Sequence, residues 1–288
     1  MNIKPYITSF RLRTLPLSVA GVVLGAALRS GEMRWWVFLF TVVTTLCLQI
    51  LTNLANELGD ALKGTDAEQS GRQQYSLQSG AITINQMKNC IWLFVALSLV
   101  FGGVLIGLTF GTLFCTQSYV FMALGVLAIV AAVKYTLGKH PYGYHGLGDL
   151  GVFLFFGLLG VLGSYYMQSQ NLTWRVFVAA VAIALPIVAV LNLNNIRDMA
   201  GDLVHHKVTL ASKLGPKWAR LYQSVLVLLP FVLFPMIGCW WPMFFLPVFA
   251  YHVYFVWTHG GSALDAHMKV LSLSTLAMAI MQFVVSLL

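Results

Sequence analysis

Acidic residues are rare in this chain, and most of them gather in two short stretches. Of nine Asp and Glu residues in 288, six lie in these stretches. Asn56 stands four residues before Asp60, and Asn194 stands four residues before Asp198, with Asp202 four residues further on. Residues four apart share a helix face, so each set should present amide and carboxylate oxygens in one direction. Such oxygens suit Mg²⁺, which often binds together with the phosphate groups of a substrate.

Other acidic residues near the first stretch have weaker spacing. Glu57 lies off the face that carries Asn56, and Asp66 is six residues beyond Asp60, which is not a helical spacing. Asp66 could reach the same site only if the chain bends after Gly64.

Two helices that face each other with such groups could hold a diphosphate between bridging metal ions and neutralise it as a leaving group.

A third segment, residues 134–149, is rich in glycine, aromatic and basic residues. Within it Tyr135 and Lys139 are four residues apart, and a lysine here could contact phosphate as a point charge. The alternative is that this segment only anchors the chain at a membrane surface. Arg197 has two interpretations as well, since it could bind phosphate or pair with the neighbouring Asp198.

The composition places the chain in a membrane. Hydrophobic residues make up 59% and charged residues 9%, whereas soluble domains carry about 25% charged residues. The formal charge of +8 is spread between apolar segments without a dense basic patch, so we expect no nucleic-acid binding. The four cysteines are far apart, which indicates neither a zinc site nor a disulfide framework.

Apolar intervals of about 20 residues predict an all-α, polytopic membrane protein that forms a single domain over residues 1–288. We predict nine spans. They are 14–28, 35–56, two within 89–133, 150–174, 176–196, two within 221–264, and 270–288.

The lysine and arginine residues predict the orientation. With a cytoplasmic N-terminus, 14 of the 17 basic residues fall on the cytoplasmic side, and the other side holds Arg29, Arg34 and Arg175. Both acidic stretches fall on the cytoplasmic side in this arrangement. Arg11 and Arg13 are interpreted as anchors at this surface rather than as ligands.

Glycines recur at every fourth position in the third predicted span, at Gly103, Gly107 and Gly111. A stripe of small residues is typical of close packing between membrane helices. We therefore predict that a neighbouring helix approaches this stripe closely.

Several segments resemble the UbiA-type intramembrane prenyltransferases, and the resemblance covers nearly the whole chain. It is strongest to the branch that prenylates 1,4-dihydroxy-2-naphthoate in menaquinone biosynthesis. The segments that carry it are residues 13–17 (RTLPL), 48–64 (LQILTNLANELGDALKG), 141–149 (PYGYHGLGD), 155–157 (FFG) and 194–198 (NNIRD) continuing to 209–210 (TL).

The resemblance implies a helical bundle around a central cavity, with a lateral opening for a lipid tail. It implies transfer of a polyprenyl group from polyprenyl diphosphate to 1,4-dihydroxy-2-naphthoate, with loss of CO₂ and diphosphate, in the bacterial cytoplasmic membrane and at its cytoplasmic side. The implied cofactor is Mg²⁺, bound by Asn56, Asp60, Asp66, Asp198 and Asp202. The implied diphosphate-binding residues are Asn56, Asn194, Arg197 and Lys139. The implied catalytic residues are Asp60, Asp198, Asp202, Lys139 and Tyr135.

Two departures from the family pattern stand out. Relatives often carry Asp at the position of Glu57, and they often have a Gly-Pro-x-Arg element where this chain reads GRQQYSLQ over residues 71–78. We therefore assign no phosphate role to Arg72. Two alternative functions stay open from the sequence. One is prenyl transfer to another aromatic acceptor such as 4-hydroxybenzoate, and the other is a secondary transporter whose two acidic stretches are repeated ion sites.

Overall fold

The computed structural model describes residues 3–64, 76–205 and 207–288, and this part of the chain contains helices and loops but no strand. The helices are α1 (Lys4–Ser9), α2 (Leu15–Ala27), α3 (Trp35–Lys63), α4 (Ile84–Phe110), α5 (Thr116–Lys134), α6 (Gly148–Val152), α7 (Leu159–Ser169), α8 (Trp174–Val204), α9 (Leu210–Leu228), α10 (Pro230–Met236), α11 (Leu246–Thr258) and α12 (Leu264–Val285). A π-helical turn, η3 (Phe153–Leu158), joins α6 to α7, and short 3₁₀ turns include η2 (Tyr142–Tyr144) and η4 (Trp241–Phe245).

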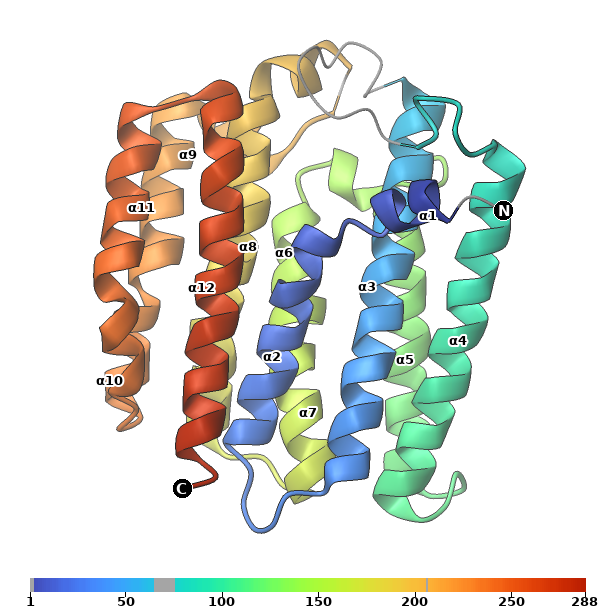
Figure 1. Cartoon of the computed structure of the whole chain (residues 1–288), viewed down its shortest axis with the longest axis vertical. Coiled ribbons are helices and arrows are strands. Elements are labelled where there is room, and N and C mark those ends of the chain that lie inside the picture. The colour runs from blue at the N-terminus through green and yellow to red at the C-terminus, as the bar shows by residue number, and fades with distance from the viewer. Residues whose placement is uncertain (1–2, 65–75, 206) are drawn as a thin grey trace.

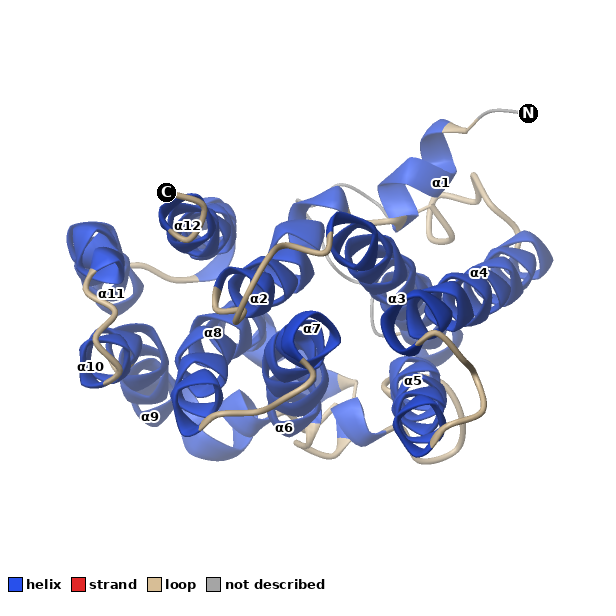
Figure 2. Cartoon of the chain, turned by 90° about the horizontal axis from the view of Figure 1, so that it is seen from below, coloured by secondary structure: helices blue, strands red, loops and turns tan. Residues whose placement is uncertain are grey.

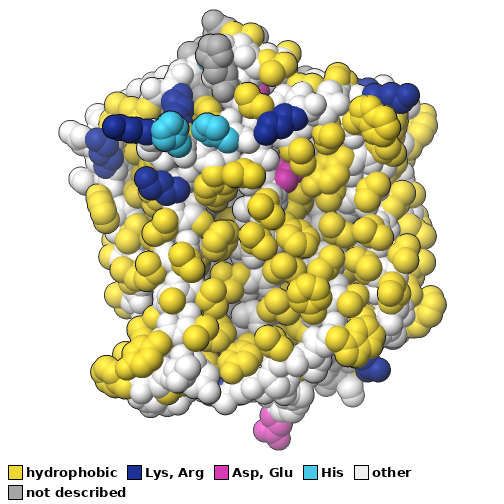
Figure 3. All heavy atoms as spheres, turned by 180° about the vertical axis from the view of Figure 1, so that it is seen from behind, with side chains coloured by type: hydrophobic (Ala, Val, Ile, Leu, Met, Phe, Trp, Pro, Cys, Tyr) yellow, Lys and Arg dark blue, Asp and Glu magenta, His cyan; other side chains and the backbone are white. Residues whose placement is uncertain are grey.

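The predicted fold class is confirmed. Within the described residues, eight helical segments are long and apolar enough to cross a membrane. The predicted eighth span is shorter than expected, because it consists of η4 followed by the 13-residue α11. Successive long helices run in alternating directions, and the two termini lie at opposite ends of the bundle (Figure 1). On the face drawn in Figure 3, hydrophobic side chains cover the middle, while lysine, arginine and histidine gather near one end.

Local sequence signals fix the ends of the helices that carry the acidic stretches. α3 stops at Gly64, which adopts a left-handed conformation with φ of 71° and lies four residues after Asp60. The next long helix begins with a capping box, in which Thr83 and Gln86 satisfy each other's backbone N–H groups. Thr209 and Ser212 form the same motif at the start of α9, directly after the second acidic stretch. Both acidic stretches therefore lie at the end of a long helix.

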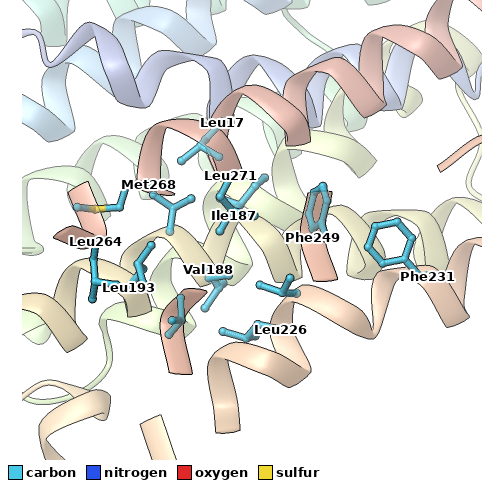
Figure 4. Packing of buried hydrophobic residues seen from close by; sticks show 14 residues of the cluster. Leu17, Ile187, Val188, Leu193, Leu226, Phe231, Phe249, Leu264, Met268 and Leu271 are labelled. Carbon is cyan, nitrogen blue, oxygen red and sulfur yellow. The ribbon is translucent and has the colours of Figure 1, made fainter. Parts of the chain in front are cut away.

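The bundle surrounds α8 on several sides, as the view along the helices shows (Figure 2). In the most apolar 18-residue stretch of α8, 72% of the residues are buried, which is more than in the corresponding stretch of any other spanning segment. One of the two large core clusters packs α8 against α9, α11 and α12 through residues such as Ile187, Leu193 and Leu271 (Figure 4). Because α8 is enclosed in this way, the second acidic stretch at its end has a fixed position.

One close helix contact depends on a glycine. A Cβ on Gly25 of α2 would lie 2.4 Å from the Val161 carbonyl oxygen and 2.8 Å from Ser164 Cβ on α7. We expect Gly25→Ala to destabilise the protein by about 1–3 kcal/mol through overpacking, measured as a lower thermal unfolding temperature in detergent. Gly163→Ala is the control, because its Cβ would meet nothing closer than 3.8 Å. An unchanged unfolding temperature in Gly25→Ala would contradict the predicted contact.

The prediction for the glycine stripe on α4 is wrong. A Cβ on Gly103 or on Gly107 would meet no atom within 4 Å. Gly111 lies past the end of α4 in the left-handed region, with φ of 74°, so its role is to end the helix. The stripe therefore leaves open space beside α4 instead of a tight helix contact.

Candidate active site

Three segments from distant parts of the sequence meet at one end of the bundle. They are the end of α3, the end of α8, and the loop between α5 and α6 that contains η2, and all three lie at the top of Figure 1. A backbone bridge between His145 and Val208 joins this loop to the segment after α8. α2 packs against both α3 and α8, so the two helices that carry the acidic stretches are held around a common space.

Asp60 lies at the centre of the first part of the site. It is buried, with 6% of its surface exposed. The Tyr144 hydroxyl donates to Asp60 Oδ1 at 2.6 Å. The Asn56 amide has partners for both of its polar atoms when its nitrogen faces Asp60 Oδ2, to which it donates at 2.9 Å, and its oxygen faces Arg11, from which it accepts at 3.1 Å. The predicted shared face of Asn56 and Asp60 is thus observed, and Arg11, which the sequence suggested only as an anchor, also contacts this cluster.

Lys207 links the two acidic stretches electrostatically. Its ammonium group lies 3.4 Å from Asp202 Oδ1. Burial lowers the pKa of this lysine, but the carboxylates of Asp60, Asp202 and Asp198 outweigh that effect and raise the pKa above its ordinary value. Lys207 is therefore charged at neutral pH and offsets part of the negative charge of these carboxylates. Asp60, Asp198 and Asp202 converge on one position, as the sequence predicted.

Tyr144 is placed among the same charges. The Lys63 ammonium lies 3.9 Å from the centre of the Tyr144 ring, and the Lys207 ammonium lies 5.7 Å from it. Cations over an aromatic face are attracted by its negative quadrupole. Tyr144 therefore holds two lysines and one carboxylate together at the same end of the bundle.

Arg197 pairs with acids, which is one of the two interpretations that the sequence left open. Its guanidinium forms a two-point contact with Asp198, from Nε at 2.8 Å and from Nη2 at 2.7 Å. Nη2 also donates to Asn194 Oδ1 at 2.5 Å, and Nη1 donates to Asp265 at the start of α12. Only 2% of the Arg197 side chain is exposed. The second asparagine–aspartate pair is thus ordered by the arginine between them.

A cavity of about 490 Å³ extends from this polar cluster into the apolar part of the bundle. Asn56, Asn194, Arg11 and Tyr135 line its polar end. The remainder is lined mainly by apolar side chains and glycines, many of them from α4, α5, η3 and α7, including Gly102, Gly103, Phe121, Met122, Gly125, Phe155, Phe156, Gly160 and Met167. The cavity thus has a head that suits a charged group and a body that suits a hydrocarbon chain.

Tyr135 and Lys139 line different cavities. Tyr135 lines the large one, and burial near Asp149 raises the pKa of its phenol above the ordinary value. The phenol is therefore neutral at physiological pH. Lys139 lines a second, more open pocket of about 560 Å³, together with Lys63, Tyr144 and Lys213. The loop between α5 and α6 contributes to both cavities.

The residues fit a divalent cation on two observations. The donor set consists of hard oxygens from Asp60, Asp198, Asp202 and two asparagines, which is the chemistry that Mg²⁺ prefers. Asp202 Oδ2 is buried and has no hydrogen-bond partner. Within the described ranges no three His, Cys, Asp or Glu side chains form a ready-made ligand set. Mg²⁺ commonly uses one or two carboxylates and completes its shell with phosphate and water.

Two sequence predictions concern the segment after α3. Asp66 lies outside the described residues, so its predicted part in metal binding stays a prediction. Glu57 is 1% exposed, and its Oε1 accepts from the backbone N–H of Leu77 at 3.0 Å. This carboxylate therefore fastens the segment before α4 to the end of α3.

Sequence reasoning missed several members of the cluster. Lys207, Tyr144, Lys63 and Asp265 were not predicted as site residues. Lys207 follows Asp202 by five residues, and Tyr144 lies in the 141–149 segment that the sequence already marked. Their positions in the sequence therefore gave a weak indication that both lie near the site. Asp265 had none, because only the packing of α12 against α8 brings it to Arg197.

Comparison with known proteins settles the family. The model of the UbiA prenyltransferase family matches residues 18–266. The chain belongs to the UbiA prenyltransferase family. Among its relatives are the 1,4-dihydroxy-2-naphthoate octaprenyltransferases of Haemophilus influenzae and Escherichia coli K12. The first is 39% identical over 230 residues, which is 78% of this chain and 74% of the relative. The second is 40% identical over 230 residues, which is 77% of this chain and 72% of the relative.

Solved structures of UbiA homologues share the fold. The apo homologue from Aeropyrum pernix K1 matches with a TM-score of 0.69 at 15% identity and covers both chains completely. A homologue from Archaeoglobus fulgidus, bound to GPP and Mg²⁺, matches with a TM-score of 0.64 at 12% identity, over 97% of this chain and 99% of the other. This UbiA chain is therefore a multi-pass membrane protein with the helical architecture of its family.

Proposed function

We propose that this UbiA-family protein transfers a polyprenyl group from polyprenyl diphosphate to 1,4-dihydroxy-2-naphthoate, with release of diphosphate and CO₂, to give demethylmenaquinone. The observation that carries the proposal is that Asn56 and Asn194 line one end of the 490 Å³ apolar cavity, while Asn56 contacts Asp60 directly and Asn194 shares Arg197 with Asp198. A prenyl tail fits the cavity and a diphosphate head fits its polar end. The choice of acceptor is supported by the relatives at 39% and 40% identity, which are named for that substrate.

Asn56, Asp60, Asp198 and Asp202 would hold Mg²⁺ beside the diphosphate, with Asn194 and Asp66 as further oxygen donors. Bound Mg²⁺ would neutralise the charge that develops on the departing diphosphate. Lys207, which contacts Asp202 and lies near Asp60 and Asp198, would add a positive charge beside the diphosphate head. Lys139 lines the pocket beyond Tyr144 and would reach a diphosphate from that side. The homologue that binds GPP and Mg²⁺ supports the metal and the class of donor.

The aromatic residues that line the cavity suit the reaction. When the bond between C1 and the diphosphate oxygen breaks, an allylic cation is left in the cavity. Tyr135, Tyr142, Phe155 and Phe156 line the cavity and offer π faces that stabilise a cation. The surrounding apolar wall keeps water from quenching the cation before the electron-rich acceptor ring attacks it. We further propose that this end of the bundle faces the cytoplasm, because most basic residues lie there.

The function is tested by offering two acceptors in competition. Purified protein in detergent receives Mg²⁺, a polyprenyl diphosphate and equal amounts of 1,4-dihydroxy-2-naphthoate and 4-hydroxybenzoate, and the lipid products are identified by mass spectrometry. Demethylmenaquinone is expected, and chelation of divalent cations should abolish its formation until Mg²⁺ is restored. Prenylated 4-hydroxybenzoate as the main product would contradict the proposed acceptor. Solute flux across liposomes without release of diphosphate would contradict the enzyme and favour a transporter.

A further inference from the structure

Every N–H group of the Arg197 guanidinium is engaged within the protein. Nε donates to Asp198, Nη2 to Asp198 and Asn194, and Nη1 to Asp265 and to the sulfur of Met268. A guanidinium has five donors in a fixed planar fork. All of these directions are used, so Arg197 has no donor left to reach a substrate.

The two carboxylates on Arg197 differ in their surroundings. The Asp198 side chain is 10% exposed, lies on α8 and belongs to the cluster around Lys207. The Asp265 side chain is 36% exposed and lies in the first turn of α12, on the other side of the guanidinium. The Arg197 guanidinium is thus shared between the largely buried carboxylate of Asp198 and the more exposed carboxylate of Asp265.

We infer that Asp265 is a positioning residue which, through Arg197, prepares Asp198 to bind a divalent cation. The inference rests on the assignment of Asp198 to metal binding in the proposed function. Asp265 holds the guanidinium from outside and takes up part of its charge. A metal ion that binds Asp198 must compete with Arg197 for its carboxylate. This competition is weaker while Arg197 also pairs with Asp265. Without Asp265 the whole guanidinium charge falls on Asp198, which opposes the approach of another cation.

A purely structural role for Asp265 has a different signature. An acidic residue in the first turn of a helix stabilises that helix through the helix dipole. If this were its only role, replacement would lower the unfolding temperature and leave metal affinity unchanged. The effect would also be the same whether or not Arg197 is present. Metal affinity and its dependence on Arg197 therefore separate the two roles.

The test is a Mn²⁺ titration of the full-length protein in detergent without substrate, followed by electron paramagnetic resonance of free Mn²⁺. We expect Asp265→Asn to raise the Mn²⁺ dissociation constant about tenfold, in the range of close charge pairs. Asp265→Glu keeps the charge and should stay within about twofold of the wild type. Glu32→Gln, in the exposed loop between α2 and α3, is the control and should change nothing. Asp265→Ser replaces Asp265→Asn if the latter is not recovered as folded protein.

The decisive comparison is made in the Arg197→Gln background. There Asp265→Asn should shift the dissociation constant by less than about twofold, because the residue that transmits the effect is gone. Wild-type Mn²⁺ affinity in Asp265→Asn, or an equal shift in both backgrounds, would overturn the inference. Failure of the wild-type protein to bind Mn²⁺ would instead overturn the metal assignment in the proposed function, and the inference would fall with it.

Discussion

Asp60→Asn and Asp198→Asn should each reduce prenyl transfer at least about a hundredfold, because each removes one of the few negative charges that can hold a cation at the diphosphate. Asparagine keeps the size of the side chain and one oxygen, so packing around α3 and α8 is preserved. The loss should therefore appear in the rate and not in the amount of folded protein. The measurement is the initial rate of formation of the prenylated product with saturating Mg²⁺, donor and acceptor.

Two further measurements separate a chemical effect from a structural one. Thermal unfolding in detergent should show that both variants stay folded, although the Tyr144 hydroxyl then donates to a neutral oxygen in Asp60→Asn. Glu32→Gln changes an exposed carboxylate in the loop between α2 and α3 and should leave the rate unchanged. Wild-type rates in either aspartate variant would refute the assignment of metal binding to these two residues.

The sequence was sufficient to predict the convergence of the acidic stretches. Spans of about 20 apolar residues become long, rigid helices, and their number and direction decide which ends lie together. Asn56 with Asp60 and Asn194 with Asp198 also keep the predicted spacing, because both pairs lie inside regular helix. Periodicity is reliable here because the helices continue through the motifs.

Spacing gives no guidance where the helix stops. Tyr135 and Lys139 are four residues apart, which on a helix would place them side by side. α5 ends at Lys134, so the rule does not apply to the following residues. Tyr135 turns into the large cavity and Lys139 lines the second pocket. A spacing argument therefore requires evidence that the segment is helical throughout.

Charge pairing between distant segments was the part that sequence reasoning could not reach. Arg197 next to Asp198 suggested a local ion pair, but the second carboxylate comes from Asp265, 68 residues along the chain. Lys207 and Tyr144 likewise reach Asp60 only because separate loops fold over the end of the bundle. Hydrophobic patterning predicts which helices form, whereas these contacts depend on how the helices and loops are rotated and stacked.

The open space beside Gly103 leads to a second prediction with a large effect. Gly103 lines the cavity, and a Cβ there would meet no atom within 4 Å. Farther along α4, Ile106 packs with Met167 and neighbouring aromatic residues, and both Ile106 and Met167 line the same cavity. We expect Gly103→Leu to fill the middle of the cavity and to lower kcat/KM for long polyprenyl diphosphates about ten- to hundredfold. Geranyl diphosphate, which needs less depth, should keep its rate.

The same helix supplies the matched control for this substitution. Gly107 lies one turn farther along α4, also has no atom within 4 Å of a Cβ, and does not line the cavity. Gly107→Leu changes the helix in the same way, so it should leave the ratio of kcat/KM values for long and short donors unchanged. Parallel assays with donors of increasing length measure that ratio for both variants. If Gly103→Leu accepts the longest donor as well as the wild type does, the hydrocarbon chain does not occupy this cavity, because a leucine side chain at that position removes space that the chain would need.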